Sequence, residues 1–123
     1  MFQDALEQVL QNTPGAVAVT LMGFDGITVA NSVVKDGGSS QVVEFETVAI
    51  ELGSLVSQFS MHAEELGVGP FRELVVEGEN LTTVVRTVTP EYFIALSLRP
   101  GGNSGKGRYN LRVLGPKLVP DLT

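Results

Sequence analysis

The clearest pattern in the chain is a helical repeat of apolar residues within residues 41–66. The apolar positions alternate in spacings of three and four residues, which predicts one amphipathic helix about 39 Å long. We expect its main apolar stripe to lie on a sheet, with Val48 and Leu55 widening one side. The stripe consists of Val42, Phe45, Ala49, Leu52, Val56, Phe59, Ala63 and Leu66.

A second group of apolar and small side chains lies away from this stripe on the same predicted helix, and we call it the outer strip. Its small residues would let a second helix approach closely. Because two-fold homodimers are the commonest oligomers, we predict a helix-to-helix contact here. The alternative is a scatter of exposed apolar residues, which is common on protein surfaces. The outer strip consists of Val43, Ile50, Gly53, Ser54, Ser57 and Met61.

Shorter patterns before the long helix predict a helix and a hairpin. Apolar residues at positions 2, 5, 6, 9 and 10 share one helical face, and Pro14 should end that helix near residue 12. Residues 16–22 read as a buried strand, and residues 27–30 return as a second strand after a turn that contains Asp-Gly. Residues 31–40 contain Asp, Gly and Ser, and we expect a loop.

Three strands and a short helix are predicted after the long helix. The strands are expected at 71–77, 81–88 and 92–98, and the short turns between them favour an antiparallel meander. A final helix is expected over residues 104–114, because Pro116 and Pro120 disfavour its continuation.

The predicted element order is therefore α-β-β-α-β-β-β-α. It indicates a single domain over residues 1–123, of the α/β class and the α+β type, built on a five-stranded antiparallel sheet. We expect the long helix to cover one face. The terminal helices should share the other layer or lie at the edges.

Composition narrows the class of protein. Hydrophobic residues make up 43% and charged residues 18%, so a folded core is expected and disorder is not. There is no Cys, which excludes disulfides and thiolate chemistry. No apolar run approaches the roughly 20 residues of a membrane span, and the first residues do not resemble a signal peptide. We expect a cytoplasmic protein.

Charge is divided unevenly along the chain. The net charge is −6, but five of the eight basic residues lie in residues 99–123, beside a single acid. An acidic body repels nucleic acid and anionic membranes, so we expect neither as a partner.

Candidate catalytic chemistry is sparse. Residues 101–107 (GGNSGKG) resemble a phosphate loop, but Pro100 stands at its first Gly position and Gly107 at its hydroxyl position. We expect instead a loop that caps a helix at Asn103 or Ser104. His62 is the only histidine, which is too few for a typical metal site. We predict no catalytic residues, no cofactor and no metal, and hence no enzyme.

Charged residues on two helices are candidates for partner binding. Glu44, Glu51 and Glu65 belong to a polar stripe with a seven-residue repeat on the long helix. A solvated helix face also explains that stripe. Lys106, Arg108 and Arg112 lie on the final helix. They suggest either a cationic rim or an arginine finger for a GTPase.

Several segments, in this order, resemble the roadblock/LC7 domain family. They are residues 6–10 (LEQVL), 15–19 (GAVAV), 23–27 (GFDGI) and 103–111 (NSGKGRYNL). The resemblance implies a two-fold dimer in which long helices pair and sheets join, with no active site. Family members serve Ras-like small GTPases as activating factors, platforms or complex subunits.

Residues 22–26 (MGFDG), 89–93 (TPEYF) and 105–109 (GKGRY) are similar to bacterial roadblock proteins of the Mgl cell-polarity systems. This resemblance implies a homodimeric adaptor, located at a cell pole. Its implied partners are an MglB-like roadblock protein and a RomR-like response regulator, and it would act on an MglA-type GTPase indirectly. The alternatives are a direct GTPase-activating regulator, motivated by Arg108 and Arg112, and a nucleotide-binding enzyme, motivated by the imperfect phosphate loop.

Overall fold

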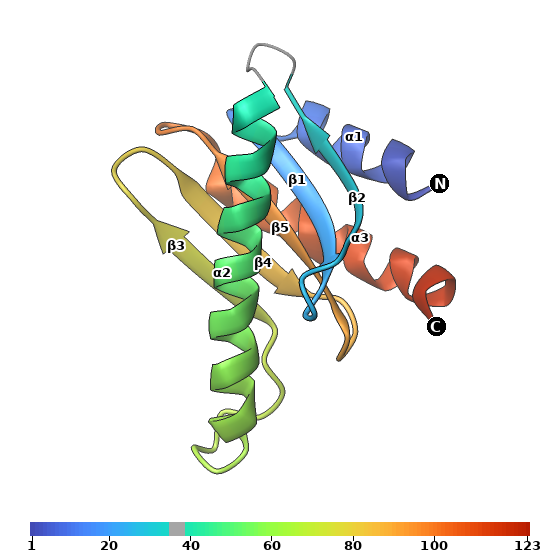
Figure 1. The fold of residues 1–123 in the computed structure, drawn as a ribbon, viewed down its shortest axis with the longest axis vertical. Coiled ribbons are helices and arrows are strands. Elements are labelled where there is room, and N and C mark those ends of the chain that lie inside the picture. Colours follow the sequence, from blue (N-terminus) through green and yellow to red (C-terminus); the bar gives the residue numbers. More distant parts are fainter. Residues whose placement is uncertain (35–38) are drawn as a thin grey trace.

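The computed structural model describes residues 1–34 and 39–123. The apolar repeat forms one helix, α2 (Ser39–Ala63), which crosses one face of the sheet alone (Figure 1). Ala49, Leu52 and Val56 of the predicted stripe are buried against the strands. The 3.6-residue period therefore places these side chains where the sequence predicted them, on the sheet.

α2 ends three residues earlier than expected. The carbonyl of Ala63 accepts a hydrogen bond from the N–H of Val68 at 2.8 Å, and Gly67 has a φ of +76°. A glycine in this left-handed conformation is a common way to end a helix. Leu66 consequently lies beyond the helix and is exposed, so its assignment to the buried stripe is wrong.

The sheet is antiparallel throughout, in the order β2-β1-β5-β4-β3 among the described residues. The central strand β5 and its neighbour β1 are buried along nearly their whole length, which explains their almost continuous apolar sequences. β2 and β3 form the two edges. The strands are β1 (Ala16–Gly23), β2 (Thr28–Val33), β3 (Glu73–Glu77), β4 (Thr82–Thr87) and β5 (Tyr92–Leu98).

The terminal helices share the second layer, α1 (Phe2–Asn12) beside α3 (Ser104–Leu122), on the face opposite α2 (Figure 1). Their buried leucines and Val9 pack on one side of the central strands. A smaller cluster on the other side joins Met22 and Phe93 to α2. The sheet thus separates two cores, which gives an α/β/α arrangement of three layers.

α3 is longer than its sequence suggested. It continues through Pro116 and Pro120 to Leu122, so the predicted end at residue 114 is wrong. Each proline removes one backbone hydrogen bond, and both rings lie on the exposed side of the helix. Leu111 and Leu118 are buried on the opposite side, and this packing outweighs the lost bonds.

The first edge strand is also longer than expected. β2 extends to Val33, with Asn31 opposite Thr20 and Val33 opposite Ala18. The prediction of a loop from residue 31 is therefore wrong, because pairing with β1 satisfies the backbone of these polar residues. α2 begins at Ser39, within the same predicted loop.

Candidate interaction surfaces

The outer strip of α2 is exposed at most of its described positions. Ile50 is 44% exposed and Met61 is 75% exposed, and Ser54 and Ser57 are exposed as well. Val43 lies outside the residues whose side chains are described. Two large apolar side chains on the surface of one helix, three turns apart, are consistent with a contact surface.

Gly53 does not belong to this surface, and its assignment to the outer strip is wrong. It is buried, and a Cβ added there would lie 2.6 Å from Cζ of Phe93. The absence of a side chain therefore lets α2 approach the sheet of its own chain. The glycine lies at the boundary between the stripe and the outer strip, where spacing alone favours neither side.

The opposite flank of α2 carries a second group of exposed apolar residues, which the spacing had assigned to the sheet. Leu55 is more than half exposed, so the prediction that it widens the buried stripe is wrong, whereas Val48 is packed against the core as predicted. Phe59 is partly exposed and meets the ring of Phe71 edge-on, at 5.6 Å between centroids. Apolar residues therefore flank the outer face of α2 on both sides.

Acidic residues lie along the same helix. Glu44 and Glu51 are exposed on α2, and Glu65 is exposed just beyond its end. Glu46, which the sequence did not single out, accepts hydrogen bonds from Thr28 at 3.3 Å and Asn31 at 3.1 Å. It holds the first half of α2 against β2, while the three exposed glutamates face solvent.

The edge strand β3 is a second candidate surface. It pairs with β4 on one side, and no other described strand pairs with its second edge. Val75 and Val76 are exposed on this short strand. An unpaired edge offers backbone N–H and C=O groups to another strand.

Glu73 connects this edge strand to the α3 layer. Its Oε2 accepts a hydrogen bond from Nε of Arg108 at 2.7 Å, and its Oε1 lies 3.5 Å from Nη1 of Arg86. The Glu73 side chain is only 14% exposed. Sequence reasoning missed Glu73, since 35 residues separate it from Arg108 and no local pattern marks the pair.

The two other basic candidates on α3 surround an aromatic ring. Lys106 Nζ and Arg112 Cζ each lie 5.8 Å from the centroid of Tyr109. Both cations are exposed, as is the ring. The three candidate bases of α3 therefore separate into two sites, with Arg108 on Glu73 and the other two on Tyr109.

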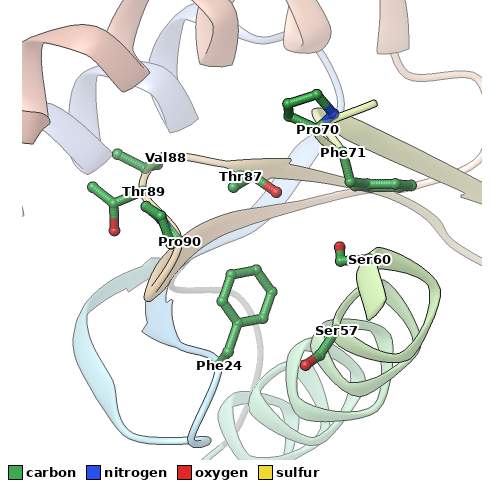
Figure 2. A pocket seen from close by; sticks show the side chains of 9 residues that line it. All are labelled: Phe24, Ser57, Ser60, Pro70, Phe71, Thr87, Val88, Thr89 and Pro90. Carbon is green, nitrogen blue, oxygen red and sulfur yellow. The ribbon is translucent and has the colours of Figure 1, made fainter. Parts of the chain in front are cut away.

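A pocket of about 390 Å³ opens near the end of α2, between the β1–β2 turn and the β4–β5 turn (Figure 2). Phe24 and Phe71 contribute rings, and Ser57 contributes a hydroxyl. Its other lining residues are Ser60, Pro70, Thr87, Val88, Thr89 and Pro90. None of these side chains is an acid, a base or a strong nucleophile, so the pocket suits an apolar side chain of a partner better than catalysis.

Comparison with solved structures places the chain among known proteins. The crystal structure of MglC from Myxococcus xanthus is 36% identical in sequence, over 96% of both chains, with a TM-score of 0.71. The chain belongs to the roadblock/LC7 family. No protein-family model and no curated protein sequence matches it.

Two more distant structures share the roadblock/LC7 fold. A roadblock/LC7 domain from Streptomyces avermitilis has a TM-score of 0.81 at 17% identity, over 98% of this chain and 96% of its own. The gliding protein MglB from Thermus thermophilus has a TM-score of 0.79 at 21% identity, over 94% of this chain and 83% of its own. Both superpose better than MglC, but the higher sequence identity makes MglC the more informative relative.

The glycine-rich segment of this roadblock/LC7 chain has a structural explanation. The Asn103 side chain accepts a hydrogen bond from the N–H of Lys106 at 2.9 Å and so caps α3, as one of the two predicted alternatives required. A Cβ at Gly15 would lie 2.5 Å from Cα of Gly102. The loop is therefore packed against the start of β1.

The single histidine, the grouping of acidic residues and the hydropathy of the helices complete the description of the surface. His62 is exposed at the end of α2. Within residues 1–34 and 39–123, no three His, Cys, Asp or Glu residues are grouped where they could hold a metal ion. None of the helices in those ranges is both long and apolar enough to cross a membrane.

Proposed function

We propose that this chain is a non-catalytic, homodimeric roadblock adaptor in a bacterial cell-polarity or motility system governed by a Ras-like small GTPase. The observation that carries the proposal is the 36% identity to MglC over 96% of both chains. Because this chain belongs to the same family as MglC, we propose that it acts in the cytoplasm, at a cell pole.

Two features support a homodimer. The outer face of α2 exposes Ile50 and Met61, and the second edge of β3 lacks a partner among the described strands. Pairing of two α2 helices around a two-fold axis would cover the first feature, and joining of two β3 strands would cover the second. A single symmetric contact would thus satisfy both.

The proposed partners are an MglB-like roadblock protein and a RomR-like response regulator. We propose that these partners contact the exposed glutamates of α2 and the pocket shown in Figure 2. We propose that a GTPase of the MglA type is reached through the second roadblock protein and does not bind this chain directly.

The alternative, direct stimulation of GTP hydrolysis, receives less support. An arginine finger must be free to enter the active site of the GTPase. Arg108 is instead hydrogen-bonded to Glu73 at 2.7 Å, and Arg112 lies over Tyr109. Either arginine would have to leave its contact before it could act.

The dimer is tested by sedimentation of the wild type and of Ile50→Asp. A buried carboxylate in a helix-to-helix contact costs several kcal/mol. We therefore expect the dissociation constant of the variant dimer to be at least about tenfold higher than that of the wild type. Gln11→Asp, which adds the same charge at an exposed position of α1, should leave the wild-type dissociation constant unchanged. A wild type that is monomeric at micromolar concentration would contradict the homodimer.

The adaptor role is tested with purified MglB-type and MglA-type proteins from the same organism. We expect this chain to bind the MglB-type protein, measured by calorimetry, and to leave single-turnover GTP hydrolysis unchanged when added to the GTPase alone. Stimulation by this chain alone, lost in Arg108→Ala, would favour the direct regulator. Absence of binding to the MglB-type protein would exclude the proposed partner.

A further inference from the structure

A groove of about 370 Å³ runs between α1 and α3 on the face of the molecule opposite α2. Tyr109, Val113 and Lys117 form its α3 wall, and Ala5 and Gln8 belong to its α1 wall. The two helices lie side by side in Figure 1. The groove is therefore separate from the outer face of α2 and from the edge of β3.

The α3 wall exposes apolar surface to solvent. Tyr109 is 51% exposed and Val113 is 41% exposed, one helical turn apart. On the other side of the same helix, Leu111 and Leu118 are buried in the core. The packing of this chain therefore does not require an aromatic and a branched apolar residue at positions 109 and 113.

The charge around this apolar surface is opposite to that of the molecule as a whole. Lys106 and Arg112 each lie 5.8 Å from the Tyr109 ring, and Lys117 lines the groove. Within the described chain, no salt bridge involves any of these three bases. Asp121 is the only acidic residue among the described lining residues, while the whole chain carries −6.

We propose that this groove binds an acidic amphipathic helix from a partner protein. Its apolar side would pack on Tyr109 and Val113, and its carboxylates would face Lys106, Arg112 and Lys117. Lys106 and Lys117 are about 17 Å apart along α3 at the rise of an α-helix, so about three turns of a partner helix would span the basic positions. A helix in a groove between two helices is a recurrent mode of peptide recognition.

The same chemistry makes a membrane surface the poorer occupant. Membrane-binding helices combine a broad apolar face with a net basic charge. Here the exposed apolar surface of α3 is limited to a short stretch beside a concave groove, and the remainder of the protein is acidic. A third helix fits the groove, whereas a flat anionic surface would also meet the acidic body.

Three synthetic peptides of about 14 residues test the charge preference. They share one apolar helical face of leucines and differ only at the flanking positions, which are glutamate, glutamine or lysine. We expect affinity, measured by fluorescence anisotropy, to fall from the glutamate to the lysine peptide. The net charge of the protein predicts the reverse order, so equal or reversed affinities would overturn the proposal.

Matched variants locate the binding. Val113→Glu and Lys117→Glu should each weaken binding of the glutamate peptide about tenfold, because each removes one central contact of the groove. Val68→Glu and Arg72→Glu change another exposed valine and another exposed base, both outside the groove, and should have no effect. Nuclear magnetic resonance spectra of each variant establish that it is folded, and shifts confined to α1 and α3 should accompany binding to the wild type.

Two further outcomes would assign the groove to another occupant. If Val113→Glu dissociated the homodimer, a second copy of the chain would occupy it. If phosphatidylserine vesicles retained the wild type and the glutamate peptide failed to compete, a membrane would occupy it. Either result would overturn the proposal, while leaving the adaptor function to its own test, which is binding to the MglB-type protein.

Discussion

The α1/α3 face of the sheet buries leucines between two helices, whereas the α2 face is covered by one helix that approaches closely through Gly53. The first layer contains Leu6, Leu111 and Leu118. The second buries mainly small or branched side chains of α2, and leaves Ile50 and Met61 exposed. The difference indicates that the α1/α3 side contributes the larger part of the buried core, whereas α2 leaves more of its own apolar side chains exposed.

The largest expected effect tests the first half of this comparison. Leu111→Ala removes a fully buried side chain from the α1/α3 core and should lower the free energy of unfolding by about 3 kcal/mol. Urea denaturation measures it. Leu52→Ala removes the same atoms from the α2 side, where Leu52 is less completely buried, and should cost about 1 kcal/mol less. Equal losses would contradict the assignment of stability to one face.

A smaller effect tests how closely α2 lies on the sheet. Gly53→Ala places a Cβ 2.6 Å from Phe93 Cζ, and this overpacking should outweigh the gain in helix propensity and destabilise by about 1 kcal/mol. Hydrogen exchange should accelerate in α2 and remain unchanged in α3.

Gly105→Ala in α3 is the matched control. Beyond its neighbours in the helix, the nearest atom to the added Cβ is Asn103 Oδ1 at 3.6 Å, an ordinary contact, so this variant should be stabilised by about 0.5 kcal/mol. If Gly53→Ala were stabilised equally, the close contact between α2 and Phe93 would be wrong.

An effect similar in size to that of Gly53→Ala is expected at the ionic link between the edge strand β3 and α3. Glu73→Gln removes the charge that Arg86 and Arg108 share and should destabilise by about 1 kcal/mol, since Glu73 is largely buried but Arg108 is half exposed. Thermal unfolding measures the change. Glu77→Gln, at an exposed position of the same strand, should have almost no effect. If both variants unfolded at the same temperature, the ion pairs of Glu73 would not contribute to stability.

Most of the fold could be predicted from the sequence because its elements have strong local patterns. The repeat of α2 and the apolar strands β1 and β5 each gave the element and its buried side. The end of α3 was missed because two prolines are a local signal against a helix, while the burial of Leu118 that keeps it helical depends on the sheet. At this end of α3, tertiary packing overrode the local preference of the two prolines.

The candidate surfaces were only partly accessible to the same reasoning. Periodicity placed Ile50 and Met61 on the exposed side of α2, but it could not show which neighbour required Gly53 to be small. The charges of α3 were noted, but their separate partners, Glu73 and Tyr109, depend on contacts in three dimensions. Whether the outer strip is a dimer contact stays a prediction.

The ion pairs of Glu73 also affect the thermodynamics of association. Glu73 is the first residue of β3, and its contacts to β4 and α3 hold one end of the edge strand in place within a single protomer. A strand that is already ordered loses less conformational entropy when another strand pairs with it. In the proposed homodimer, part of the entropic cost of joining two sheets would thus already be met when the protomer folds.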